Sequence, residues 1–152
     1  SCLVGSEMCI RDSYYRLDIL KSINISGPNG GLIREHDRIF KFTCTVSSII
    51  NLDKHPIDLH IIVHPTYIRH YPDAMGLCYE KDENDVEIHL ARRCVEGIRN
   101  PLYQTLTHEL LHARQTCLGE KMYERPVRKH EEFIYQLAKE KLTIEKDNVC
   151  RL

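Results

Sequence analysis

The pentapeptide His108-Glu109-Leu110-Leu111-His112 constrains this chain more than any other stretch of its sequence. It lies within residues 101–119, a segment that opens on Pro101 and closes on Gly119, and these two residue types suit the two ends of a helix. Four apolar residues recur at helical spacing along the segment: Leu102, Leu106, Leu110 and Ala113. The pattern therefore predicts a largely buried helix with both histidines on one face.

Histidines at positions i and i+4 of a helix lie one above the other, so His108 and His112 can share one metal ion. Glu109 points to a neighbouring side of the same turn, where it reaches a water molecule without ligating the metal. Two ligands and a base are what metal-assisted hydrolysis requires. The plainer alternative is a pair of hydrogen-bonded core histidines beside a surface glutamate.

His108, Glu109 and His112, within residues 105–115, resemble the active-site helix of the zincin metallopeptidases. The order of elements over residues 35–142 also resembles a minimal zincin or SprT-like core. Zincins with a third histidine six residues after the second are excluded, because Gln115 and Leu118 stand where that pattern has glycine and histidine. The resemblance implies a Zn²⁺-dependent peptidase of the glutamate-ligand type.

A third zinc ligand is expected on a second helix, predicted over residues 125–142. Glu131 falls on its apolar face, and a buried carboxylate requires a partner such as zinc. We therefore predict Glu131 as the third ligand, with His130 and Glu132 as alternatives. A weak ion pair of Glu131 with Arg114 or Arg128 is the competing explanation. Five residues mark the apolar face: Val127, Ile134, Leu137, Ala138 and Leu142.

The predicted reaction is peptide hydrolysis by a water molecule whose pKa zinc lowers toward about 7. Glu109 takes the proton as general base and delivers it to the leaving amine. Tyr123, Arg128 and His130 are candidate donors to the oxyanion. Gln115 is expected to orient a ligand from outside the metal's own shell.

Two other classes of protein compete with this interpretation. One is a catalytically inactive zinc-binding scaffold or interaction domain with a zincin-like fold, against which the retained Glu109 argues. The other is a metal-free helical domain that binds a partner. Zinc content separates the second class from the first, and peptide turnover separates the scaffold from the enzyme.

The composition gives no electrostatic basis for binding nucleic acid or a membrane surface, and the resemblance to zincins implies a peptide or protein substrate. Lys and Arg number 21 against 22 Asp and Glu, so the net charge of −1 gives no basis for binding polyanions. No apolar run is long enough to span a bilayer. The 7 cysteines are odd in number and form no C-x-x-C pair, which favours reduced thiols and a cytoplasmic location. The oligomeric state stays open.

Residues 1–13 resemble a translated sequencing adapter and lack the basic start and apolar core of a signal peptide. We therefore expect a non-native tail over residues 1–13 and a single zincin-like metallopeptidase domain over residues 14–152.

The fold class predicted for that domain is α+β, with a small mixed sheet, a packing helix, the H-E-x-x-H helix and a closing C-terminal helix. The expected elements are a strand at 14–25, a helix at 36–52, a strand at 58–64, and a hairpin of 75–80 with 86–91. A strand over 43–50 competes with the first helix because that stretch is rich in β-branched residues. By resemblance to zincins, one hairpin strand binds an extended peptide. His60 and His89 lie on strands and are not expected to be ligands.

Overall fold

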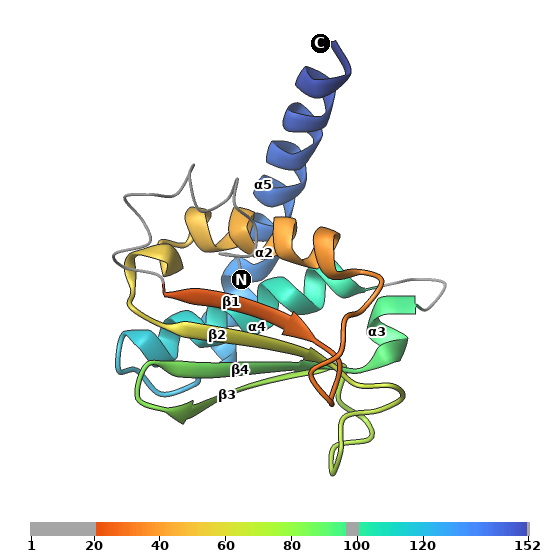
Figure 1. Cartoon of the computed structure of the whole chain (residues 1–152). Helices are drawn as coiled ribbons and strands as arrows, with labels where there is room; N and C mark the ends of the chain where they lie inside the picture. Colours follow the sequence, from red (N-terminus) through yellow and green to blue (C-terminus); the bar gives the residue numbers. More distant parts are fainter. Residues whose placement is uncertain (1–20, 97–100, 152) are drawn as a thin grey trace.

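One four-stranded sheet, covered by helices on one face, forms the body of the molecule in the computed structural model (Figure 1). The structure describes residues 21–96 and 101–151. The strands are β1 Ser22–Ser26, β2 Asp58–Val63, β3 Gly76–Asp82 and β4 Asp85–Leu90. The helices are α2 His36–Ile49, α3 Arg92–Glu96, α4 Leu102–Cys117 and α5 Glu124–Arg151, with a 3-10 turn at Leu52–Lys54.

The strands follow the order β1-β2-β4-β3, in which β1, β2 and β4 are parallel and β3 runs antiparallel to β4 at one edge. Alternate residues face opposite sides of a strand. In β2, Leu59, Ile61 and Val63 are buried, whereas the residues between them are only half-buried. One face of the sheet therefore packs on the helices, and none of the described helices covers the other, here called the open face.

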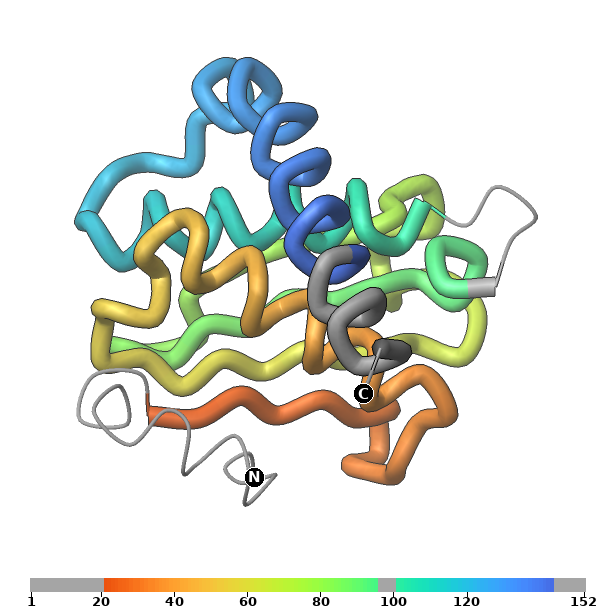
Figure 2. Tube along the Cα trace, turned by 90° about the horizontal axis from the view of Figure 1, so that it is seen from above, coloured from red at the N-terminus to blue at the C-terminus, as the bar shows by residue number. Residues whose placement is uncertain are grey.

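The helices form two layers behind the sheet (Figure 2). Helix α2 packs against β1, α4 packs against β3 and β4, and α5 crosses over both α2 and α4 without lying on the sheet. The predicted α+β architecture is confirmed, including the mixed sheet, the packing helix and the closing helix.

Helix α4 has the buried stripe that the sequence predicts. Leu102, Leu106, Leu110 and Ala113 are all at most 1% exposed. The helix stops at Gly119, whose φ of 72° is easily reached only by glycine. The Gly119 N–H donates to the Thr116 carbonyl and the Glu120 N–H to the Gln115 carbonyl, which is the hydrogen-bond pattern of a Schellman motif.

The elements predicted from the sequence differ from the observed ones mainly at their ends. Residues 43–49 belong to α2 rather than to a strand, and Ile50 caps the helix, because Ile39, Phe42 and Val46 share one fully buried helical face. Helix α5 extends to Arg151, well beyond the predicted end at 142, and α3 is not predicted at all. The predicted first strand coincides with β1 over residues 22–25, while residues 14–20 and the expected tail at 1–13 lie outside the described residues.

Within the described residues, no helix is both long and apolar enough to cross a lipid bilayer. Four described cysteines carry free thiols: Cys44, Cys78, Cys94 and Cys117.

Candidate metal centre

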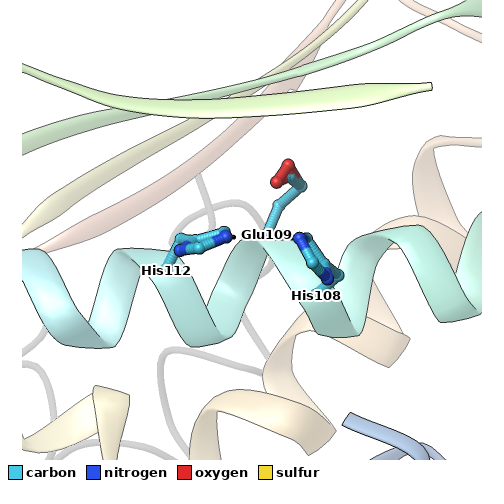
Figure 3. A group of neighbouring side chains, drawn as sticks. All are labelled: His108, Glu109 and His112. Carbon is cyan, nitrogen blue, oxygen red and sulfur yellow. Dashed lines mark hydrogen bonds between the residues drawn. The ribbon is translucent and has the colours of Figure 1, made fainter. Parts of the chain in front are cut away.

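Helix α4 gathers the three residues of the H-E-x-x-H pattern. One ligand atom from each of His108, Glu109 and His112 lies within 4.8 Å of the others. Figure 3 shows the two imidazoles along one side of α4, while the Glu109 carboxylate points toward the strands. The group is a candidate metal site on a single helix.

The two histidines present their Nε2 atoms to each other at 3.2 Å, with the rings at 75°. Two nitrogen ligands on a tetrahedral zinc ion, each about 2.05 Å from it, are about 3.3 Å apart. The separation of the Nε2 atoms therefore already fits one zinc ion.

Gln115, the residue expected to orient a ligand, contacts His112 at Nδ1, the ring nitrogen that does not face His108. The Gln115 amide Nε2 donates to the Tyr123 carbonyl at 3.0 Å, and its Oε1 lies 2.9 Å from His112 Nδ1. Tyr123 thereby ties the turn after α4 to the histidine, although its side chain is 57% exposed.

His108 lies between two carboxylates of α5. Glu131 Oε2 is 2.6 Å from His108 Nδ1, and Glu124 Oε2 is 3.2 Å from His108 Nε2. Glu131 thus faces inward, as predicted, but it contacts the ring nitrogen that points away from His112. The predicted role of Glu131 as a metal ligand is not tested by this contact.

Glu124 is the functional candidate that the sequence prediction missed. Its Oε1 lies 3.0 Å from His112 Nε2, so its carboxylate faces the Nε2 atoms of both histidines. Burial opposes ionisation, but His108, His112 and Arg128 hold the pKa of Glu124 below its usual value. Its spacing of seven residues from Glu131 was an available signal, because residues two helical turns apart share a face.

Glu109 is 4% exposed, and its Oε2 has no hydrogen-bond partner. Burial raises the pKa of Glu109 to about 7; the charge of His108 opposes this rise, while Glu124 and Glu131 add to it. Unpaired buried carboxylate oxygens are uncommon in proteins. A water molecule held by the metal would supply the missing partner, so this oxygen also fits a metal-bound site.

A cleft of about 370 Å³ opens beside His108 and Glu109. Its wall comes from the start of β3, from α4 and from α5, through Met75, Gly76, Gln104, Thr105, Glu131, Glu132 and Tyr135. A Cβ at position 76 would lie 2.7 Å from Thr105 Cγ2 and 3.1 Å from Glu109 Cγ. Glycine at this position therefore allows β3 to lie directly against the face of α4 that carries Glu109.

The remaining predicted candidates lie at the margin. Glu132 lines the cleft and accepts a hydrogen bond from Gln136. The side chains of His130 and Arg128 are exposed. Arg114, a proposed ion-pair partner of Glu131, instead donates to the Ile50 carbonyl.

Both strand histidines expected to stand apart from the site lie on the open face of the sheet. His60 pairs with Asp85 at 3.1 Å. His89 belongs to a second group, here called the outer cluster: His64, Tyr79, Lys81, Glu87 and His89. The inner cluster is His108, Glu109, His112, Glu124 and Glu131.

Comparisons of the chain with protein-family models, with curated proteins and with solved structures found no match. The likeness to zincins therefore rests on the H-E-x-x-H group of α4 and its geometry.

Proposed function

We propose that this protein is a zinc-dependent peptidase that hydrolyses peptide bonds. The observation that carries the proposal is Glu109, a buried carboxylate with an unpaired oxygen, set beside the convergent Nε2 atoms of His108 and His112. An imidazole pair with one carboxylate is a donor set that suits zinc.

His108 and His112 would hold the metal through Nε2, and α5 would supply a carboxylate as third ligand. When bound, zinc supplies a water molecule of lowered pKa and polarises the scissile carbonyl as a Lewis acid. Open coordination room on the cleft side, next to Glu109, favours a catalytic rather than a closed structural site.

Glu109 would act as the general base, and the proton would then pass to the leaving amine. Burial raises its pKa to about 7, close to neutral pH, where a base can both accept and release a proton. The Glu109 side chain packs closely against Gly76, where an added Cβ would lie 3.1 Å from Glu109 Cγ, and this packing would limit its movement.

The free edge of β3 would bind the substrate. Among the described residues, β3 pairs with β4 alone, and Met75 and Gly76 at its start line the cleft. An extended peptide that adds to this edge through backbone hydrogen bonds would pass over the active face of α4. This arrangement supports a peptide or protein substrate.

Zinc stoichiometry and peptide-library cleavage test the proposal together. Wild-type protein should bind one zinc per chain and cleave peptides, whereas Glu109→Gln should keep the zinc and lose about 10²–10⁴-fold in turnover. Glu83→Gln, the same change on the exposed β3–β4 turn, is the matched control and should cleave normally. Stoichiometric zinc without cleavage by the wild type would favour the inactive scaffold.

A further inference from the structure

We infer that Glu124, rather than Glu131, is the third protein ligand of the metal centre, and that Glu131 and Gln115 orient the two histidines. This inference rests on the proposed zinc peptidase and assigns the roles of its residues. Its starting point is that each imidazole has two chemically distinct nitrogens, of which only one faces the shared site.

The hydrogen-bond network around Gln115 fixes the tautomer of His112. Because the Gln115 amide nitrogen donates to the Tyr123 carbonyl, the atom that faces His112 Nδ1 is the amide oxygen. This oxygen can only accept, so His112 Nδ1 carries the hydrogen. The lone pair of His112 is therefore on Nε2, the atom that faces His108.

Glu131 has the same relation to His108 that Gln115 has to His112. Its carboxylate lies 2.6 Å from His108 Nδ1, and an ionised carboxylate only accepts. His108 Nδ1 therefore donates to Glu131, which leaves Nε2 to the metal. Carboxylates that accept from the rear nitrogen of a metal-ligating histidine fix the ring and raise its basicity.

Glu131 therefore lies behind the His108 ring relative to the shared site, and it would have to give up its Nδ1 contact to ligate an ion held at Nε2. Glu124 needs no such rearrangement. Its two oxygens lie 3.0 Å from His112 Nε2 and 3.2 Å from His108 Nε2. Ligand atoms that share one tetrahedral zinc ion are about 3.3 Å apart, and each Nε2 atom already has one Glu124 oxygen close to that distance.

Position along α5 explains the division of roles. Glu124 is the first residue of the helix and its side chain is 55% exposed, so it can adjust to an ion. Glu131 lies two turns later beside the cleft, with a side chain that is 35% exposed. Glu124, in the first turn of α5, therefore supplies the ligand, and Glu131, two turns later, orients the His108 ring.

Zinc affinity, measured by competition with a chromophoric chelator, separates the two roles. Glu124→Gln should weaken zinc binding at least about 100-fold, because an amide replaces a charged ligand. Glu131→Ala should weaken it about 10–100-fold, and Glu131→Gln should restore most of the loss, because its amide oxygen still accepts from His108 Nδ1. Glu132→Gln, the same change on the same turn but without a histidine contact, should bind zinc as the wild type does.

Cobalt substitution gives a second readout that does not depend on activity. The d–d absorption of the Co²⁺ protein should change in Glu124→Gln and stay close to wild type in Glu131→Gln. Loss of zinc in Glu131→Gln together with wild-type affinity and spectrum in Glu124→Gln would overturn the assignment and leave the peptidase proposal standing. A wild-type protein that binds neither metal would overturn both.

Discussion

The inner and outer clusters lie on opposite faces of the edge strand β3, and each combines two histidines with a buried glutamate. Glu87 of the outer cluster is 8% exposed and Glu109 of the inner cluster 4%. The pKa values of these two glutamates are nevertheless shifted in opposite directions. Burial alone would raise the pKa of Glu87, but hydrogen bonds from Tyr79, His89 and Lys81 lower it to about 2. Glu109 has no such donors, and burial raises its pKa to about 7.

The histidine pairs differ in geometry. His64 Nε2 lies 2.7 Å from His89 Nδ1, a distance that suits a shared proton, and His89 Nε2 in turn donates to Glu87 at 2.9 Å. The His108 and His112 Nε2 atoms are 3.2 Å apart and converge on a common point. The unpaired Glu109 Oε2, rather than residue type or burial, thus distinguishes the inner cluster from the outer one, in which three side chains hydrogen-bond the Glu87 carboxylate.

Removal of one histidine from each cluster should give the largest contrast. His108→Ala should lower zinc affinity by about 1000-fold or more, because it removes one of the two proposed imidazole ligands. His89→Ala should leave both the stoichiometry and the affinity of zinc binding unchanged. Isothermal titration of both variants checks this prediction, and zinc loss in His89→Ala would erase the contrast between the clusters.

The stability of the metal-free protein should depend on pH through Glu109. Its pKa rises from 4.5 to about 7 on folding, so the stability that its protonated form contributes is complete below pH 4.5 and is lost as pH rises through 7. The free energy of unfolding should fall by about 3 kcal/mol over this range, because each pKa unit corresponds to about 1.36 kcal/mol. Urea unfolding of metal-free protein at pH 5 and pH 8 measures it, and Glu109→Gln should remove most of this dependence. The pH dependence from Glu87 has the opposite sign, because the stability that its ionised form contributes is lost as pH falls from 4.5 toward 2.

Gly76 joins the two clusters, because β3 carries Tyr79 on one face and packs against Glu109 on the other. Gly76→Ala should destabilise the protein by about 1–3 kcal/mol, since the new Cβ would lie 2.7 Å from Thr105 Cγ2. Thr105→Ser removes the Cγ2 methyl group, so the double variant Gly76→Ala/Thr105→Ser should regain part of the lost free energy of unfolding. Chemical denaturation of the single and double variants tests this coupling, and strictly additive effects would contradict it.

Tyr79→Phe should give the smallest effect. The free energy of unfolding should fall by about 1 kcal/mol, and zinc affinity should not change. It removes the 2.5 Å hydrogen bond from Tyr79 to Glu87, while His89 and Lys81 still pair with that carboxylate. Thermal unfolding at pH 7 provides the measurement. A loss of several kcal/mol would mean that the outer cluster stabilises the edge strand far more than its exposed position suggests.

Local patterns predicted that His108, Glu109 and His112 form one group, because these residues are close in sequence. The spacing of His108 and His112, the stripe around Leu106 and the stop at Gly119 are all properties of one helix and its end. The inward direction of Glu131 likewise followed from the periodicity of α5.

The same reasoning did not single out Glu124, which shares one helical face with Glu131. Glu124 and Glu131 both face α4, and only the path of the turn after Gly119 decides which carboxylate meets which ring nitrogen. The sequence did not predict the outer cluster, for a different reason. The contact of His64 with His89 depends on the parallel register of β2 and β4, a long-range pairing that periodicity does not encode.

The closeness of these groups along the chain also limits how much a bound metal can stabilise the fold. His112 and Glu124 are 12 residues apart, whereas Ser22 and Asp58, which link β1 to β2, are 36 apart. Closing so short a loop around an ion costs less entropy than closing a long one, so we expect the unfolded chain to retain some affinity for zinc. Metal that also binds the unfolded state shifts the folding equilibrium less than its native affinity implies. In a zinc titration, the unfolding midpoint should therefore rise less steeply than binding to the native state alone requires.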